Sequence, residues 1–196
     1  DSVEELDDSG WTILFHPDLI RKSELGKTIR NYSFFNYEIN EALHLSHREK
    51  QLLFQLVKNI DLELDHNIDT HAQDIIINNL ESILKYSNRY YDRQFFRRTN
   101  LNKDFVSKFE QFLQSYFSSP ELTEKGMPSI KQCGEAMNMS GSYLSDLLKI
   151  ETGRSAKDHI SSYLIEQAKT KLLNSNSSIS EIAFNLGFDY PQHFSQ

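Results

Sequence analysis

The C-terminal third of this 196-residue sequence repeats itself, and this repeat restricts the fold more than any other feature. Ser129-Ile130 recurs 49 positions later as Ser178-Ile179. Further matches follow in the same order, Gly134 with Ala183, Met137 with Leu186, and Met139 with Phe188. Both copies begin with a capping box, Ser129-Ile130-Lys131-Gln132 and Ser178-Ile179-Ser180-Glu181. The chain is therefore expected to form one short helical unit twice.

The pattern within each copy predicts a helix-turn-helix. A small residue lies in the middle of each first helix, at Gly134 and Ala183, where a second helix has to approach closely. In the first copy, Ser140 provides a new N-cap and Gly153 a C-terminal stop for a second helix. In the second copy this helix would begin near Tyr190-Pro191, with the proline tolerated in its first turn. A short helix, a tight turn and a second helix define the motif.

A long helix is predicted between the two copies. Ser155-Ala156-Lys157-Asp158 is a capping box. One broad apolar face follows it: Ile160, Leu164, Ile165, Ala168, Leu172 and Leu173. Two helix-turn-helix units held by one rigid helix suit two successive major-groove entries on one face of DNA, roughly 34 Å apart. The sequence stops at Gln196, one turn into the last helix, so we expect the natural protein to continue.

Five motifs follow one another over about residues 128–196: Met139-Ser140-Gly141-Ser142-Tyr143-Leu144-Ser145, Lys149-Ile150-Glu151-Thr152-Gly153-Arg154-Ser155, Ile165-Glu166-Gln167-Ala168-Lys169, Ser180-Glu181-Ile182-Ala183-Phe184-Asn185-Leu186-Gly187-Phe188 and Pro191-Gln192-His193-Phe194-Ser195. In this order and at this spacing they resemble the AraC/XylS family of bacterial transcription regulators. The resemblance implies an all-helical domain that binds double-stranded DNA.

The resemblance also implies which residues contact DNA. The base-reading positions match Ser142, Ser145 and Asp146 in the first recognition helix and Gln192, His193 and Gln196 in the second. Further DNA-contact candidates on these helices are Ser140, Tyr143, Lys149 and Ser195. Candidates for phosphate contacts, which position a protein without reading sequence, are Lys131, Arg154, Lys157 and Lys169.

Two positions depart from the family pattern. The family often has arginine where this chain has Asp146, and arginine in the linker helix where it has Leu164. A carboxylate cannot bind guanine as arginine does, although it can accept a hydrogen bond from cytosine N4. The DNA target is therefore not transferable from relatives. The alternative reading of Ser142, Ser145, Asp146 and Lys149 is a solvated helix face.

The first 46 residues are the least helical part of the sequence. Residues 11–15 and 32–37 are short, aromatic and β-branched, and predict two strands separated by Pro17 and Gly26. Because two strands alone make no stable sheet, they either cover a helical body or end a larger β domain upstream. The family resemblance implies the second arrangement, with residues 1–46 as the tail of a cupin-like sensor domain that holds a small-molecule effector.

Helical spacing begins at residue 46. The capping box Ser46-His47-Arg48-Glu49 begins a helix over about 47–65, Asp69 can cap a second helix, and a third runs from about Lys103 to Ser118-Ser119-Pro120. We predict a mainly α fold with a helical dimerisation and sensor region at 47–117, a linker at 118–128 and the double helix-turn-helix domain at 129–196, truncated at its C-terminus.

A basic stripe lies within the second of these helices. Lys85, Arg89, Arg93 and Arg97 recur every four residues, with aromatic residues between them. The stripe could contact the DNA backbone or an acidic partner. The alternative is a solvated face that pairs with acids such as Glu81 and Asp92, and this is the interpretation we favour.

Composition narrows the function classes. The net charge of −7 argues at first against a nucleic-acid partner. The acidity is unevenly distributed, however. Residues 129–196 hold six basic and seven acidic groups, a net charge of −1, so residues 1–128 carry the remaining −6. No apolar run approaches the ~20 residues that span a bilayer, which predicts no membrane partner. One cysteine, Cys133, can form neither an internal disulfide nor a cysteine-built zinc site, and a cytoplasmic location is expected.

No spacing of serine, histidine and acidic residues argues for catalysis, and we predict no enzyme activity, no catalytic residues, no cofactor and no bound metal. The predicted function is a sequence-specific transcription regulator of the AraC type that responds to a ligand and acts as a homodimer. The alternative is a helical sensor or dimerisation module that works through protein–protein contacts.

Overall fold

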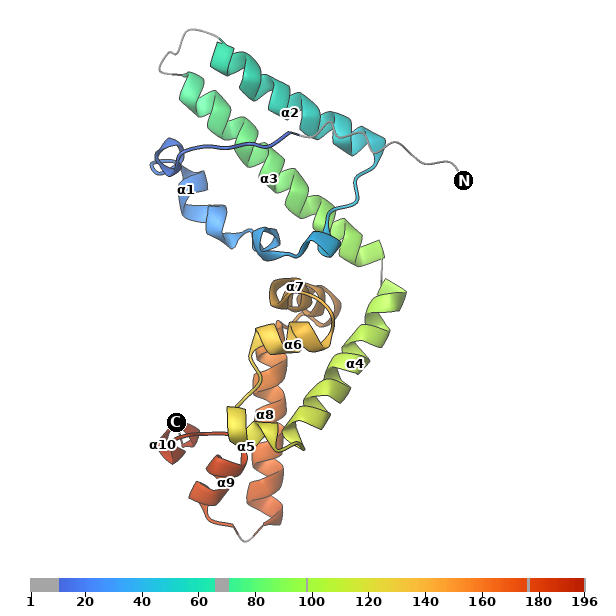
Figure 1. Cartoon of the computed structure of the whole chain (residues 1–196), viewed down its shortest axis with the longest axis vertical. Helices are drawn as coiled ribbons and strands as arrows, with labels where there is room; N and C mark the ends of the chain where they lie inside the picture. Colours follow the sequence, from blue (N-terminus) through green and yellow to red (C-terminus); the bar gives the residue numbers. More distant parts are fainter. Residues whose placement is uncertain (1–10, 66–70, 98, 176, 196) are drawn as a thin grey trace.

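A computed structural model describes residues 11–65, 71–97, 99–175 and 177–195, and the regular elements of this part are all helical (Figure 1). The α-helices are α1 Glu24–Thr28, α2 His47–Asp65, α3 Ala72–Arg97, α4 Thr99–Phe117, α5 Glu121–Lys125, α6 Ile130–Ala136, α7 Gly141–Thr152, α8 Ala156–Asn174, α9 Ile179–Asn185 and α10 Pro191–Phe194. Four 3-10 turns precede α2: η1 Pro17–Leu19, η2 Ile29–Asn31, η3 Ser33–Asn36 and η4 Ile39–Glu41. The predicted mainly α fold is confirmed.

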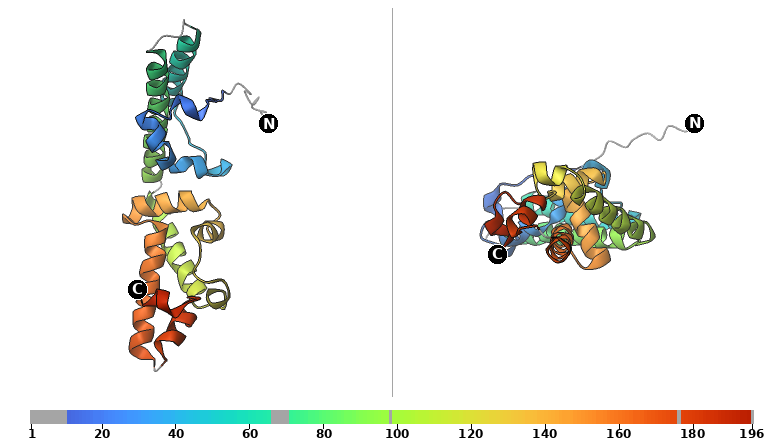
Figure 2. Two further views of the ribbon diagram at one scale, coloured as in Figure 1. Left: turned by 90° about the vertical axis from the view of Figure 1, so that its left-hand side faces the viewer. Right: turned by 90° about the horizontal axis from the view of Figure 1, so that it is seen from below.

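A hairpin of α2 and α3 forms one end of an elongated molecule (Figures 1 and 2). Leu53 and Ile60 of α2 meet Leu80 and Ile83 of α3 in its core, and the segment from Ile13 to Leu45 packs against the same core. This burial is the expected result of the helical spacing predicted from residue 46 onward. The hairpin therefore carries the N-terminal segment on one of its sides.

The two strands predicted at residues 11–15 and 32–37 are wrong. Residues 11–15 have no regular structure, and Ser33–Asn36 form the 3-10 turn η3, closed by a hydrogen bond from the Tyr37 amide to the Phe34 carbonyl (3.2 Å). The aromatic rings pack on α3 instead: Phe34 stacks on Tyr91 with the ring centroids 5.5 Å apart. An aromatic, β-branched pattern suits any half-buried surface, and here that surface covers a helix. Residues 32–37 therefore cover a helical body, which is the first of the two arrangements that the sequence left open.

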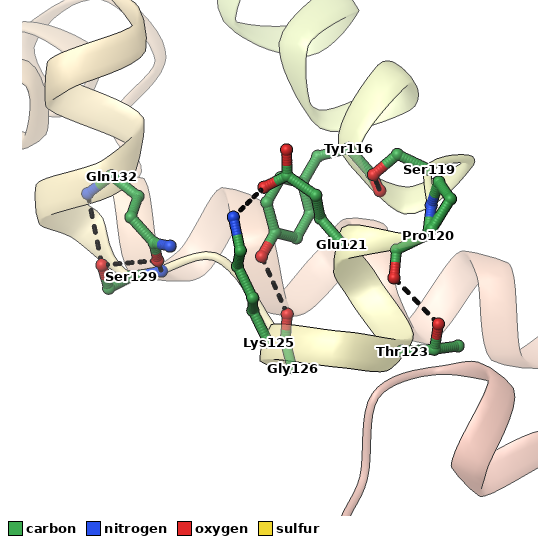
Figure 3. Close-up of polar contacts among 9 residues, drawn as sticks. All are labelled: Tyr116, Ser119, Pro120, Glu121, Thr123, Lys125, Gly126, Ser129 and Gln132. Carbon is green, nitrogen blue, oxygen red and sulfur yellow. Dashed lines mark hydrogen bonds and ion pairs between the residues drawn. The ribbon is translucent and has the colours of Figure 1, made fainter.

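Residues 118–128, predicted as a linker, contain the short helix α5. Leu122 in α5 is buried, and the Tyr116 hydroxyl donates a 3.0 Å hydrogen bond to the Gly126 carbonyl (Figure 3). Lys125 pairs with Glu121 at 3.1 Å one turn apart. The far side of α5 reaches the second helix-turn-helix, because a Cβ on Gly187 would lie 2.6 Å from the Leu122 carbonyl oxygen. This connection is ordered by contacts at both of its ends.

Helix α4 shares a core with the first helix-turn-helix. Phe109 and Leu113 of α4 are buried against Cys133 of α6 and against Leu144 and Leu148 of α7. The first unit is therefore built from three helices, with α4 closing the side that α6 and α7 leave open.

Candidate nucleic-acid interface

The first helix-turn-helix begins with the predicted capping box. The Ser129 hydroxyl accepts a 3.2 Å hydrogen bond from the Gln132 amide, and the Gln132 side-chain oxygen accepts one of 2.8 Å from the Ser129 amide (Figure 3). The turn that follows is closed by a hydrogen bond from the Met139 amide to the Gly134 carbonyl (3.0 Å). Asn138, in this turn, has a left-handed backbone with φ of 56°. Asparagine tolerates this conformation better than most residues.

The two helices approach each other closely at Gly134, where the sequence predicted a small residue to be needed. A Cβ there would lie 2.6 Å from the Met139 carbonyl oxygen and 2.7 Å from the Gly141 amide nitrogen. Both are backbone atoms of the turn and of the start of α7, so neither can move aside alone. Gly134 therefore sets how tightly α6 and α7 pack.

The second unit repeats this turn atom for atom in its hydrogen bonding. The Phe188 amide donates to the Ala183 carbonyl at 3.1 Å, as Met139 does to Gly134. Gly187 has a φ of 80° and stands 49 positions after Asn138, which has a positive φ at the matching place in the first turn. Helix α10 begins at Pro191, and the Phe194 ring packs edge-on against Phe188 with the centroids 5.4 Å apart. The sequence repeat is therefore a structural repeat.

Helix α8 holds the two units at its opposite ends (Figure 1). Its capping box is present, because the Ser155 hydroxyl accepts from the Asp158 amide at 3.3 Å and Asp158 accepts from the Ser155 amide at 3.0 Å. The hydrogen bond from the Ser155 hydroxyl lowers the pKa of Asp158, so the Asp158 carboxylate of this capping box stays charged at neutral pH. Ile160 belongs to the core of the first unit and Ala168 to that of the second. One straight helix thus fixes the spacing of both turns.

The predicted DNA-contact residues of the second unit lie on its surface. Gln192, His193 and Ser195 are exposed on α10 or at its end. The Ser195 hydroxyl donates to the Pro191 carbonyl at 3.5 Å. Gln196 lies outside the described residues.

The predicted phosphate-contact residues are all exposed. Lys131 approaches Glu135 at 3.9 Å and Lys169 pairs with Glu166 at 2.7 Å, each pair within one turn of its helix. Arg154 donates to the Asp158 carbonyl and to the Ser162 hydroxyl. Such exposed interactions are weak and can exchange for a phosphate. They leave these cations, with Lys157, available at the surface.

The first recognition helix presents only part of its predicted reading face. Lys149 is exposed and Ser142 is half-buried. The Ser145 hydroxyl accepts a 3.3 Å hydrogen bond from the Ala156 amide, which ties it to the start of α8. Ser140 caps α7 by accepting a 3.1 Å hydrogen bond from the Tyr143 amide. Of these residues, Ser142, Ser145 and Lys149 fall on one face of α7 by their helical spacing, while Ser140 stands at its start.

Tyr143 and Asp146 face the N-terminal half of the chain instead. Tyr143 is buried, and its ring packs on Phe95 of α3 with the centroids 4.8 Å apart. Asp146 accepts a 2.7 Å hydrogen bond from the Tyr37 hydroxyl. The structure also brings Glu41 to the start of this helix, where its carboxylate accepts from Ser140. Sequence reasoning missed Tyr37 and Glu41, because contacts between residues about a hundred positions apart leave no local pattern.

The basic stripe of α3 is partly used within the fold. Lys85 pairs with Glu81 at 2.7 Å. Arg93 forms an ion pair with Glu49 of α2 and donates a 3.1 Å hydrogen bond to the His44 carbonyl. The side chain of Arg97 lies outside the described residues. Two of the four cations thus serve intramolecular contacts, as the solvated-face reading expects.

His159 should make the first unit less stable in mild acid. Its Nε2 lies 2.8 Å from the Thr152 hydroxyl, linking α8 to the end of α7. Burial, and then the positive charge of Arg154, lower the pKa of His159 below 6.5, while Glu110 and Asp158 oppose this. A depressed histidine pKa means that the unfolded chain binds the proton more readily. The contribution of neutral His159 to the free energy of unfolding is therefore complete above about pH 6.5. It is lost as the pH falls from there through the lower pKa of the folded state.

This expectation is checked by measuring the thermal midpoint between pH 7.5 and pH 5.5. The midpoint should fall towards pH 5.5 in the parent and change less in His159→Gln, which stays neutral and can still bond to Thr152. The carboxylate of Asp158, whose pKa is lowered, titrates below this window and does not interfere. An equal fall in both proteins would show that His159 is not the group responsible.

Comparison with known proteins agrees with this geometry. Residues 133–196 match a family model described as a helix-turn-helix domain, of the AraC type. The match covers the two turns and α8, and it supports an AraC-type DNA-binding domain in this part of the chain. No match was found among curated proteins or among solved structures. Within the described residues, no helix is both long and apolar enough to cross a membrane.

The match at residues 133–196 therefore supports a DNA-binding regulator of the AraC type. Families of this kind act on double-stranded DNA and are generally not enzymes.

Proposed function

We propose that the protein is a sequence-specific transcription regulator that places its two helix-turn-helix units in neighbouring segments of one DNA major groove. The observation that carries this proposal is the pair of matching turns, Met139 to Gly134 and Phe188 to Ala183, at the two ends of α8. A rigid connection makes the spacing of the two contacts a property of the protein, and the DNA must supply two blocks at that spacing.

Base reading falls to the surface residues of α7 and α10. Ser142, Ser145 and Lys149 would contact the first block, and Gln192 and His193 the second. Glutamine forms a bidentate pair with adenine, so an adenine in the second block is the expected partner of Gln192. Lys131, Arg154, Lys157 and Lys169 would hold phosphates, and each such contact makes binding more sensitive to salt.

Dimerisation and effector response complete the proposal. We assign dimerisation to the helices of residues 47–117. In support, α2 exposes Phe54 and Leu64, which are 47% and 62% accessible, on the outside of the hairpin. We assign the effector to a cupin-like sensor domain, as the family resemblance implies. A regulator of this kind would act in the cytoplasm, where its DNA is.

The test is selection of binding sites from random duplex DNA by the protein. The expected result is a motif of two blocks about 10 to 10.5 base pairs apart, centre to centre. In Gln192→Ala the preference at one position of the second block should relax. In Lys131→Gln affinity should fall evenly for all sequences, and the salt slope should decrease by about 0.9. The absence of any salt-dependent enrichment would favour the protein–protein alternative.

A further inference from the structure

The carboxylate of Glu41 occupies the N-terminus of the first recognition helix. One of its oxygens accepts a 2.6 Å hydrogen bond from the Ser140 amide, and the other accepts one of 2.6 Å from the Ser140 hydroxyl. The second oxygen also accepts from the Glu38 amide at 2.7 Å, which fixes the carboxylate on its own turn η4. Glu41 is 6% exposed, so this negative charge is buried and satisfied by donors on both sides.

Tyr37 makes a second, separate contact two turns along the same helix. Its hydroxyl donates to Asp146 at 2.7 Å, and its ring stands edge-on to Tyr143 with the centroids 5.2 Å apart. On its other side, the ring packs edge-on against Tyr91 of α3 at 5.0 Å. Burial, and then the hydrogen bond to Asp146, raise the pKa of Tyr37, so the hydroxyl remains a donor at neutral pH.

These contacts use the groups that a recognition helix offers to DNA. Backbone amides and hydroxyls at a helix N-terminus hold phosphate oxygens, and side chains in the first turns reach base edges. A carboxylate oxygen is an anionic acceptor like a phosphate oxygen, and Glu41 takes up both donors of Ser140. The Tyr37 hydroxyl donates its hydrogen bond to Asp146, which stands at a position where the family often has arginine. These groups are therefore already engaged by residues 37–41 and would have to be released before they could bind DNA.

We propose that residues 37–41 form an internal substitute for DNA, with Glu41 in place of a phosphate, and that the first recognition helix enters the major groove only after they separate from it. We call these residues the clasp. The inference rests on the proposed function and adds its regulation. Asp146 then serves to hold the clasp, which accounts for a carboxylate at a reading position.

The clasp is placed to respond to events elsewhere in the chain. Next to it, the His44 amide donates to the Gln94 side chain of α3 at 2.9 Å. The clasp is therefore connected to the α2–α3 hairpin, where dimerisation is assigned. If only a fraction of molecules is open, the apparent dissociation constant is the intrinsic one divided by that fraction. A signal that shifts the hairpin would change DNA affinity without touching a DNA-contact residue.

The test compares the parent chain with Tyr37→Phe and with the double variant Tyr37→Phe/Glu41→Gln. The first removes one hydroxyl and is not expected to disturb folding. Matched controls are Tyr32→Phe, on the same segment, and Glu24→Gln, whose carboxylate pairs with Lys27. Two quantities are measured: affinity for a fluorescein-labelled duplex of mixed sequence at low salt, by anisotropy, and hydrogen exchange of the Ser140 amide.

The expected result is an affinity gain of about tenfold in the double variant, within the usual 5–150-fold range of coupling between sites. Tyr37→Phe should give a smaller gain, and the controls none. The Ser140 amide should exchange faster in the double variant even without DNA. Faster exchange of the Ser140 amide with unchanged DNA affinity would show that the contact does not compete with DNA. Unchanged exchange would show that the clasp does not hold the helix. Either outcome overturns this inference and leaves the proposed function standing. If neither parent nor variants bind DNA, the proposed function fails as well.

Discussion

Replacement of Gly134 by alanine should destabilise the first helix-turn-helix by about 2–3 kcal/mol, the usual cost of overpacking a rigid core. In an ordinary helix this substitution stabilises by roughly 0.5–1 kcal/mol, because alanine is the better helix former. Here the added methyl would stand 2.6 Å from the Met139 carbonyl oxygen and 2.7 Å from the Gly141 amide nitrogen. Relief requires α6 and α7 to separate, which disrupts the 3.0 Å hydrogen bond from Met139 to Gly134.

The matched control is Gly153→Ala at the other end of α7. Gly153 has a φ of 75°, and no atom lies within 4 Å of its added Cβ. Its substitution therefore costs only the left-handed conformation, about 1 kcal/mol. Urea unfolding of both variants measures the difference. A Gly134→Ala protein as stable as the parent would mean that α6 and α7 do not pack as closely in solution.

The helix-turn-helix half could be predicted from the sequence because its determinants are local. Each of the capping boxes that begin at Ser129, Ser155 and Ser178 spans only four consecutive residues, and each forms as predicted. The turn at Gly134 needs only the next few residues. Local signals of this kind specify an element wherever the rest of the chain lies.

The N-terminal half could not be predicted to the same depth. Residues 32–37 carry a strand-like pattern, yet their backbone bonds close a 3-10 turn and their rings pack on Tyr91. A pattern of aromatic residues reports burial, while the neighbouring element decides the backbone geometry. The same limit applies to the site. Tyr143 and Asp146 lie on α7 as predicted, but Tyr37, which contacts both, stands more than a hundred positions earlier in the chain. Glu41, which bonds to Ser140, is about as distant in sequence.

Replacement of Phe109 by alanine is expected to have the largest effect, about 3–5 kcal/mol lost from the free energy of unfolding. The Phe109 ring is fully buried in α4, in one core with Cys133 of α6 and with Leu144 and Leu148 of α7. Removing it leaves a cavity under the recognition helix that these neighbours fill only in part. The control is Phe54→Ala in α2: this ring is 47% exposed, and its one cation contact, with Lys58 at 4.8 Å, is worth about 0.5–1 kcal/mol.

A second measurement, the reactivity of the Cys133 thiol, shows whether the loss of packing lies in the core of the first unit. Burial raises the pKa of the Cys133 thiol to about 11, so the parent should react slowly with a disulfide reagent at pH 8. In Phe109→Ala the new cavity borders Cys133, and the reaction should become much faster; in Phe54→Ala it should stay slow. If both variants lose little stability and keep a slow thiol, α4 does not belong to the core of the first unit. If the prediction holds, α4 belongs to the core that packs under α7. The proposed clasp would then be a second connection between α7 and the N-terminal half of the chain.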